Sequence, residues 1–374
     1  MIVEMQNVRE SVWNSALREV EPKGTLFQST YWAEYLRRTF GDRPIYLASL
    51  DKKGNIQGQL LAIQSCYGKH AALTLSGKSG LLLSKSYKHI VSPLLHKMAP
   101  FIFWENGPII LSKSTMESSS YKMLYRQMLE RIVKKAYKLD CYEIKFARPS
   151  FFCDDSEIFS SLGFKKRRMG TILDNINCST ETLWQRIHRE GRRTINRAIE
   201  RGIVVHKAHK FQELKEFYSL NVEASRRAKI KIYPFSFFAS LWNYFSPLNK
   251  IAIFIARLND SPIGAALFLM HNEIIHLFAI GDSDYARSNR IYPNDALIWH
   301  VMKWASERGF KYFDHSGVEL YKIDAGDEKA RNIYRFKSKW GGHLVEYHDY
   351  EKCLQNKKII RILKPFISDS VIHN

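Results

Sequence analysis

The chain has 374 residues, of which 45% are hydrophobic and 25% are charged. This composition excludes a disordered polyelectrolyte, because it supplies enough apolar residues for a packed core. The length exceeds the roughly 250 to 300 residues that one hydrophobic core usually organises, so we expect two domains.

The charge balance is strongly basic, with 57 Lys and Arg residues against 37 Asp and Glu residues and a formal net charge of +20. This surplus favours a polyanionic partner, namely RNA, nucleotide phosphates or an anionic membrane face, but charge alone does not choose among them. The five cysteines form no C-x-x-C pair, which argues against a disulfide framework and a structural zinc site. The first residues lack the apolar core of a signal peptide, so we expect a cytoplasmic protein.

The first half of the chain predicts an α/β unit. Residues 46–63 have the pattern of an apolar strand, a polar turn and a second strand. Residues 121–146 have the pattern of a helix that runs into a strand, and residues 163–174 that of a closing strand. The second half begins near residues 175–180.

The second half predicts the same kind of unit. Residues 254–269 again have the pattern of a strand, a turn and a strand. The most membrane-like stretch, residues 261–281, is interrupted by the polar residues 271–273, so it predicts a hairpin within a sheet. Residues 294–315 predict a helix followed by a strand, with Gly309 at the expected helix C-cap.

The two halves also resemble each other directly. Residues 163–174 align without a gap with residues 335–346, and residues 46–63 match residues 254–269 in the same order. Each half therefore predicts strand, turn, strand, helix, strand, short helix and strand. This order indicates an α/β unit with a mixed, largely antiparallel sheet.

The predicted divisions of the chain are a first domain at residues 1–175, a second at residues 176–350 and a basic amphipathic tail at residues 351–374. If the tail forms a helix, its basic and its apolar residues lie on different faces. This pattern favours peripheral contact with the inner face of an anionic membrane. Packing of its apolar face against the second domain is the alternative. Pro365 would kink or end such a helix.

Five segments in a fixed order carry a family pattern. They are residues 27–47, 183–206, 224–238, 304–317 and 336–342. Together they resemble the FemAB-like aminoacyltransferases, and the similarity covers residues 25–350. The resemblance implies an α/β (α+β) fold of two tandem GNAT-like domains, each a mixed, mostly antiparallel sheet flanked by helices.

The same resemblance implies a reaction. An aminoacyl group carried as an ester on tRNA would pass to an amine on the stem peptide of a peptidoglycan precursor, UDP-linked or lipid-linked. Aminoacyl-tRNA is then the co-substrate, and no metal or redox cofactor is implied. We expect the protein to act as a monomer.

Two other functions stay open. One is an N-acyltransferase that uses acyl-CoA or another thioester to modify a cell-envelope or polysaccharide amine. Residues 286–299 argue against it, because they lack the glycines of the loop that cradles pyrophosphate in CoA-dependent GNAT proteins. The other is a protein without catalytic activity that binds RNA or a membrane, which the intact Phe-Lys and Gly-Gly pairs in residues 336–342 disfavour.

Lys337 is the predicted catalytic residue, because it occupies the Phe-Lys position of the family motif beside Phe336. Aminolysis of an ester needs a neutral amine, a fixed geometry and stabilisation of the negative charge on the tetrahedral intermediate. An unperturbed lysine has a pKa near ~10.4, so a charge-stabilising role fits better than that of a general base. Gly341 and Gly342 are expected to let backbone and substrate approach closely. The repeat counterpart, Lys165, indicates that Phe-Lys also serves as scaffold.

Two further substrate-binding positions are predicted. Arg227 resembles the arginine that holds a phosphate in family members acting on UDP-linked precursors, and Arg226 beside it is its substitute. Where those relatives have a phosphate-binding lysine after the Trp-Ala of the first domain, this chain has only Arg37 nearby. Asp314 ends the predicted second-domain strand, and we expect it to form a turn before residues 315–317.

Residues 186–201 form a run rich in arginine. Arg189, Arg193 and Arg197 recur every four residues along one face of a predicted helix, with Arg192 next to them. This stripe predicts contact with an RNA backbone or a lipid-linked diphosphate. A solvated helix face without a binding role is the alternative.

Overall fold

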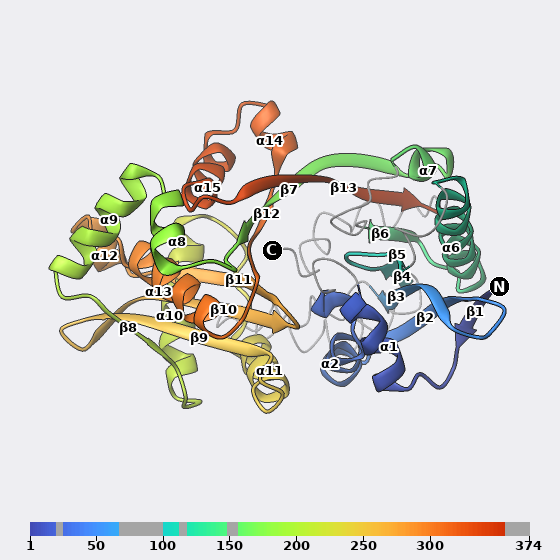
Figure 1. The fold of residues 1–374 in the computed structure, drawn as a ribbon, viewed down its shortest axis with the longest axis horizontal. Helices are drawn as coiled ribbons and strands as arrows, with labels where there is room; N and C mark the ends of the chain where they lie inside the picture. The colour runs from blue at the N-terminus through green and yellow to red at the C-terminus, as the bar shows by residue number, and fades with distance from the viewer. Residues whose placement is uncertain (20–24, 67–99, 112–117, 148–155, 356–374) are drawn as a thin grey trace, which may run out of the picture. The chain divides into compact units, whose positions relative to one another are not determined.

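The computed structural model describes residues 1–19, 25–66, 100–111, 118–147 and 156–355 (Figure 1). These residues form two compact units. Unit 1 comprises the described residues up to 169 together with residues 346–355, and unit 2 comprises residues 170–345.

Unit 1 is built on a mixed sheet with helices packed on it. Its strand order is β1 (Ile2–Met5), β2 (Arg43–Leu50), β3 (Ile56–Cys66), β4 (Pro100–Phe103), β6 (Glu143–Ala147) and β13 (His343–Cys353), with β5 (Ile109–Ile110) paired to β3. The helices in its described residues are α1 (Glu10–Ala16), α2 (Thr30–Phe40), α6 (Ser118–Lys138) and α7 (Ser156–Ser161), with short 3-10 turns at Leu17–Glu19 and Leu26–Gln28.

The two ends of α2 and the core of unit 1 follow from the sequence. The Ser29 hydroxyl accepts the Trp32 N–H at the start of α2, and Gly41 ends that helix in the left-handed conformation, at φ 65°. The buried side of α6 packs Tyr125 and Met128 into a core that includes strand residues such as Leu60. Burial of this apolar stripe holds the helix on the sheet.

Unit 2 repeats this design, with more helices than the described residues of unit 1 form. Its strand order is β7 (Lys165–Asn175), β12 (Tyr312–Val318), β11 (Ile274–Asp282), β10 (Ser261–His271), β9 (Ile251–Leu258) and β8 (Val204–Lys207). The helices are α8 (Thr180–Arg186), α9 (Arg189–Glu200), α10 (Glu213–Arg227), α11 (Phe235–Phe245), α12 (Asp284–Ser288), α13 (Pro293–Glu307), α14 (Leu320–Asp324) and α15 (Glu328–Ser338).

The predicted mixed, mostly antiparallel sheet is confirmed in both units. In unit 1 the pair β4–β6 is parallel, and in unit 2 the pair β11–β12 is parallel, while their other neighbouring strands are antiparallel. The predicted hairpin is also confirmed, because β10 and β11 pair antiparallel around Asn272, whose φ is 49°.

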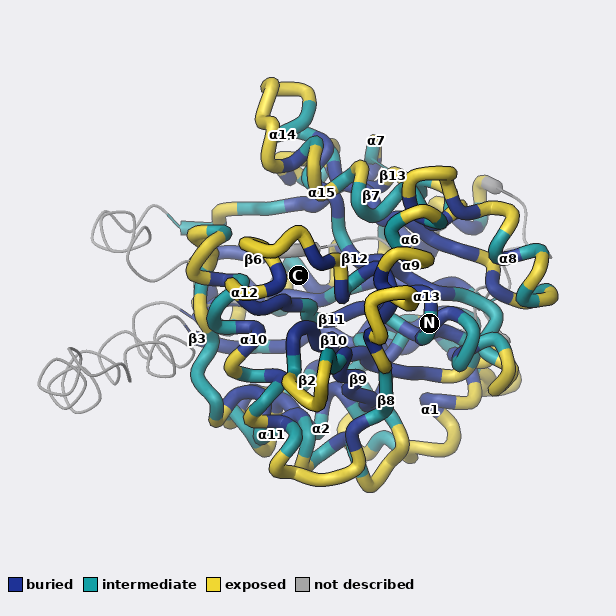
Figure 2. The backbone as a smooth tube through the Cα atoms, turned by 90° about the vertical axis from the view of Figure 1, so that its left-hand side faces the viewer, coloured by how far each residue is buried: buried dark blue, intermediate teal, exposed yellow. Residues whose placement is uncertain are grey.

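The buried middle of unit 2 explains why that hairpin resembled a membrane span. Nearly every residue of β9 and β10 is buried (Figure 2), because helices cover the sheet. Leu297 and Val301 of α13 belong to the core on this sheet. Helix α13 ends at Glu307, and Gly309 follows with φ +79°, which confirms the predicted stop.

The compact units differ from the predicted domains at both ends. Strand β7 closes the first repeat but pairs antiparallel with β12 of unit 2, and β13 closes the second repeat but pairs antiparallel with β6 of unit 1. The units therefore change at residues 169/170 and 345/346 and not at 175 and 350. Each repeat supplies the last strand of the other unit, which the order of elements alone does not reveal.

The gapless repeat alignment holds for only part of its length. Its closing residues lie in strands in both repeats, within β7 and β13. Upstream, Lys165 begins β7, whereas Lys337 lies inside α15. At this position the alignment therefore places a strand residue of the first repeat opposite a helical residue of the second. The helix before the closing strand has 6 described residues in the first repeat, α7, and 11 in the second, α15.

No helix in the described part of the chain is long and apolar enough to cross a membrane. The first residues of the predicted tail, up to Cys353, belong to β13 and not to a helix. Lys352 in that strand donates a hydrogen bond to the Leu162 carbonyl at 2.7 Å. The rest of the predicted tail, including Pro365, lies outside the described residues from residue 356 on.

Candidate active site

The only parallel ladder of unit 2, between β11 and β12, is short. It pairs residues 274–276 with residues 312–314, although β11 continues to Asp282 and β12 to Val318. His276 and Asp314 are the last pair of this ladder. Their side chains therefore lie where the two strands stop sharing backbone hydrogen bonds.

Asp314 is the centre of a buried hydrogen-bond network at this point. Its Oδ2 lies 2.7 Å from Nδ1 of His276, and its Oδ1 accepts the hydroxyl of Thr171 and, at 2.9 Å, the N–H of Ser316. Burial alone would raise the pKa of Asp314, but the charge of His276 and these hydrogen bonds outweigh it and lower the pKa to about 2. Asp314 is thus a stable carboxylate.

This arrangement corrects the expected turn-forming role of Asp314. The residue lies inside β12 and its side chain is 3% exposed. A bulge follows it, where Ser316 takes a φ of +71° and the register against β7 shifts. The Asp314 carboxylate does hold the N–H of Ser316, so one part of the turn pattern is present within a strand.

His276 is oriented by Asp314. The Nδ1–H of a neutral imidazole donates to the carboxylate, which leaves the lone pair on Nε2. The side chain of His276 is 17% exposed. By contrast, His315 is bound to Asp174 at 2.6 Å and is 0% exposed, so that second Asp–His pair is structural.

Lys337 lies beside this network. Its Nζ donates to the carbonyl of Gly317 at 2.8 Å, just past the bulge in β12. Desolvation lowers the pKa of Lys337 to about 8, and the charges of Asp314 and Glu319 only partly oppose this shift. The group is about nine-tenths protonated at pH 7 and can change its charge in the physiological range.

The flanking residues of Lys337 pack within unit 2. Phe336 makes an edge-to-face contact with Trp340 at 6.1 Å, and Lys339 lies over the Phe336 ring at 4.6 Å. A Cβ on Gly341 would come within 2.6 Å of the Cβ of Arg186, and one on Gly342 would come within 2.8 Å of β7. The glycines therefore allow close backbone packing, and the approach of substrate at Gly341 and Gly342 stays a prediction.

Comparison with known proteins identifies the fold that carries these residues. Residues 185–342, which include His276, Asp314 and Lys337, match a family model described as an acetyltransferase (GNAT) domain. The crystal structure of FemX aligns with a TM-score of 0.67 and 15% identity, over 97% of this chain and 100% of that chain.

The chain has the FemAB-like tandem GNAT fold.

Two other solved structures show the same fold. L-PGS from Bacillus licheniformis aligns with a TM-score of 0.51 and 14% identity, over 97% of this chain and 99% of that chain. A tandem GNAT protein from the clavulanic acid biosynthesis pathway aligns with a TM-score of 0.55 and 9% identity, over 96% and 99%. No curated protein sequence matches the chain. The second unit thus carries an acyltransferase domain of the GNAT type.

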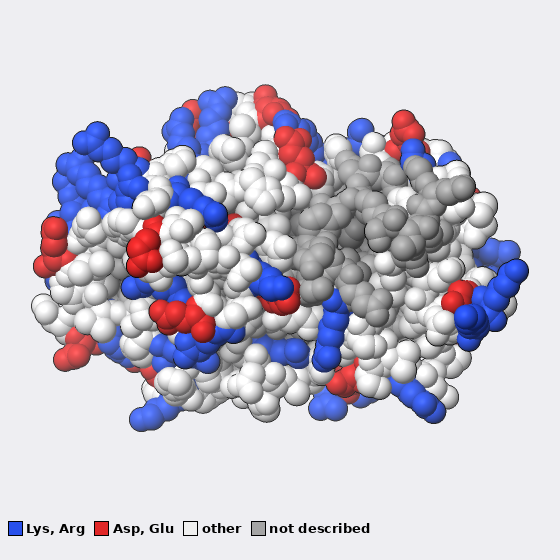
Figure 3. Space-filling view, viewed as in Figure 1, with Lys and Arg blue, Asp and Glu red and all other residues white. Residues whose placement is uncertain are grey.

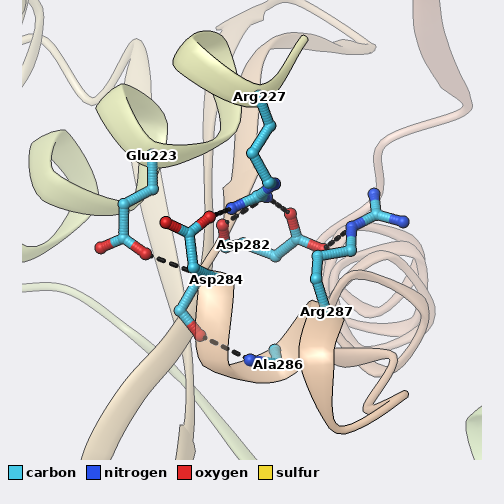
Figure 4. Close-up of polar contacts among 7 residues, drawn as sticks. Glu223, Arg227, Asp282, Asp284, Ala286 and Arg287 are labelled. Carbon is cyan, nitrogen blue, oxygen red and sulfur yellow. Dashed lines mark hydrogen bonds and ion pairs between the residues drawn. The ribbon is translucent and has the colours of Figure 1, made fainter.

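Arg227 of this GNAT domain is held by carboxylates of unit 2. Its guanidinium contacts the side chains of Asp282 and Asp284 and donates to the Asp282 carbonyl at 2.7 Å (Figure 4). Arg287 binds the other oxygen of Asp282 at 2.9 Å. A phosphate would have to displace these carboxylates from Arg227. Arg226 is exposed on the last turn of α10.

Arg37 lies in unit 1, on the last turn of α2. It is exposed and forms an ion pair with Glu34 at 2.7 Å. Hydrogen bonds from Arg37 and Arg38 and their positive charges lower the pKa of Glu34 to about 2, although partial burial opposes this shift. The predicted role of Arg37 in substrate binding stays a prediction.

The predicted arginine helix is present as α9. Arg189, Arg193 and Arg197 are exposed, while Arg192 is half-buried and donates to the Gln185 carbonyl at 3.1 Å. Arg192 therefore fixes the turn between α8 and α9, whereas the other three arginines face solvent.

The start of α13 carries an acidic group. Pro293 occupies the first turn, and Asp295 two residues later is 3% exposed. The Asp295 carboxylate accepts Lys339 Nζ at 2.6 Å and the hydroxyl of Thr194 from α9. A buried carboxylate thus already compensates the positive end of this helix, where an anion would otherwise bind.

The sequence pointed to Lys337 and Asp314, but not to His276 and Thr171 beside them. His276 lies 61 residues before Lys337 and Thr171 lies 166 residues before it, so no local motif joins them. The alternation of His276 with apolar residues in β11 was the available signal, and it is equally typical of a strand at the edge of a core.

Proposed function

We propose that the protein transfers an aminoacyl group from aminoacyl-tRNA to an amine of a cell-envelope component, the stem peptide of a peptidoglycan precursor. The observation that carries this proposal is Lys337, a desolvated lysine held at the Gly317 carbonyl beside the Asp314–His276 pair. The FemX-like fold and the GNAT domain support it.

The acceptor amine must first lose a proton, because an alkylammonium group has no lone pair with which to attack. The Nε2 of His276 is the group suited to take that proton, since Asp314 holds the other ring nitrogen and stabilises the imidazolium that forms. The amine nitrogen then bonds to the ester carbonyl carbon. The carbonyl oxygen becomes an oxyanion.

Lys337 is suited to stabilise that oxyanion. Its ammonium is desolvated, so its interaction with a developing negative charge is stronger than it would be in water. When the carbon–oxygen bond of the ester breaks, the imidazolium of His276 gives its proton to the leaving ribose oxygen. The attacking nitrogen still carries one proton more than an amide, and the neutral His276 takes this second proton and passes it to water. An ammonium group and an ester thus give an amide, a ribose hydroxyl and one released proton, and no covalent enzyme intermediate is required.

Acyl-CoA is the second candidate donor, because the matching family model is described as an acetyltransferase domain. The start of α13 disfavours it. A diphosphate placed there would meet the buried carboxylate of Asp295, which Lys339 and Thr194 already engage.

The test supplies both donors to the same protein. Purified protein is incubated with a mixture of radiolabelled aminoacyl-tRNAs or, separately, with radiolabelled acyl-CoA, in the presence of UDP-linked or lipid-linked peptidoglycan precursors. We expect label to reach a precursor only from aminoacyl-tRNA. Labelling from acyl-CoA alone would overturn the proposal.

A further inference from the structure

We propose that the exposed arginine face of α9 is the surface on which the RNA part of the donor lies. This face consists of Arg189, Arg193 and Arg197, with Arg186 and Arg201 at its two ends. The inference rests on the proposed function and adds the place where the donor's polyanion binds.

The charge on this face is available to a partner. Among the described residues, Arg189, Arg193 and Arg197 have no hydrogen-bond or ion-pair partner. Figure 3 shows Lys and Arg side chains gathered over the part of unit 2 where Figure 1 places α9. The exposed residues Glu190 and Glu200 form no ion pair with the arginines within the described residues, so the face keeps a net positive charge.

The opposite side of α9 fixes the helix in place. Gly191, Ile195 and Ala198 are buried against unit 2. At Gly191 a Cβ would come within 2.8 Å of the Ile187 side chain at the end of α8, so a larger residue would not fit there without a shift. The arginine side chains therefore project from a rigid support, which lowers the entropic cost of binding a ligand.

The length of the row favours a long polyanion. From Arg189 to Arg197 the helix rises about 12 Å, at about 1.5 Å per residue. The two linked phosphates of a diphosphate would meet only part of this row, whereas RNA offers one phosphate per nucleotide along its length. Arginine suits this contact, because its guanidinium binds phosphate oxygens in pairs.

A membrane surface fits the face less well. Peripheral helices place large apolar residues beside their basic ones so that the apolar side chains enter the lipid. On α9 the exposed large apolar residue is Ile199, which at about 100° per residue points about 120° away from Arg193 in the middle of the row.

The start of α9 is bonded to the end of the helix that carries Lys337. The N–H of His188 donates to the carbonyl of Lys339 at 2.8 Å. Lys339 Nζ binds Asp295, which also accepts the hydroxyl of Thr194 in α9. The arginine face thus begins next to the turn that follows Lys337. This position suits the donor, because its ester must reach Lys337 while its phosphates stay outside the site.

Binding of RNA can be measured apart from acyl transfer. The probe is a fluorescently labelled acceptor-stem RNA hairpin that carries no amino acid, titrated by anisotropy at several salt concentrations. The variant is Arg193→Gln with Arg197→Gln. The matched control is Lys210→Gln with Lys215→Gln, which removes two exposed positive charges elsewhere in unit 2.

We expect the arginine variant to bind the hairpin about tenfold more weakly near 0.15 M salt and to reduce the slope of log affinity against log salt by about 1.8, at about 0.9 per phosphate contact with a duplex. The control should keep the wild-type slope. Equal slopes for both variants would overturn the inference even if aminoacyl-tRNA serves as donor. Loss of binding to anionic vesicles, with RNA binding unchanged, would also overturn it.

The two proposals fail separately. If the hairpin binds through the arginines but no charged tRNA donates its amino acid, the surface stands and the proposed reaction falls. If transfer from aminoacyl-tRNA is intact in the arginine variant at limiting tRNA concentration, the surface falls and the reaction stands.

Discussion

Lys165 and Lys337 are aligned in the sequences of the two repeats, yet they lie in different elements and their surroundings differ. Lys165 is exposed at the first residue of β7, whereas Lys337 lies on α15 with its Nζ on the Gly317 carbonyl and its pKa lowered to about 8. Helix α15 extends further along the sequence than α7 does, so Lys337 is still helical and its Nζ reaches Gly317 of β12. A duplicated fold can therefore keep its sheet while only one copy encloses a reactive group.

The sharpest test of this difference is alanine substitution at both lysines. We expect Lys337→Ala to lower kcat by about 10² to 10³, the usual effect of losing one oxyanion-stabilising group. Lys165→Ala should leave kcat within about twofold, because its side chain faces solvent. Initial rates of aminoacyl transfer measure both, and an equal loss in the two folded variants would contradict the assignment.

The pairs of a histidine with a carboxylate in unit 2 offer a second comparison. His276→Gln should lower kcat about 10²-fold, because the acceptor amine loses its proton acceptor. His206 on β8 is a matched control, because its Nε2 lies 2.9 Å from a carboxylate oxygen of Glu213. His206→Gln should leave kcat unchanged. Unaltered turnover of His276→Gln would remove this residue from the mechanism.

The charge state of Lys337 predicts a pH effect. With a pKa of about 8 the side chain is an ammonium below that pH and a neutral amine above it. If the ammonium stabilises the oxyanion, kcat should fall about tenfold per unit above pH 8. In Lys337→Arg the guanidinium stays protonated, so this falling limb should disappear from the pH profile, although the overall rate is lower. A rate that rises through pH 8 in the wild type would indicate a base instead.

Alanine substitution should destabilise the protein by different amounts at two glycines, one in each unit. Gly341 has φ +101° and lies against Arg186, whereas Gly54 has φ +85° with nothing within 4 Å. Gly54→Ala should cost about 1 kcal/mol of unfolding free energy from backbone strain alone. Gly341→Ala should cost about 2 to 4 kcal/mol, because a steric clash adds to the strain. Urea denaturation measures both, and equal costs would show that the packing at Gly341 relaxes freely.

Much of the fold was predictable because it depends on local patterns. The hairpin at β10–β11, helix α13 with its stop at Gly309, and α9 with its arginine stripe follow from apolar spacing and turn residues. The exchange of β7 and β13 was not predictable, since a strand carries no mark of the unit in which it will pair.

The sequence by itself determined the duplicated α/β architecture, the basic charge of α9 and the choice of Lys337, because spacing, composition and motif are properties of the chain. Only the tertiary structure decided that Lys337 is desolvated, that Asp314 orients His276, and that Arg227 is engaged by Asp282 and Asp284. These properties depend on distances between residues far apart in the sequence. Burial and neighbouring charge, which set a pKa and the strength of an ion pair, exist only once the sheet has brought those residues together.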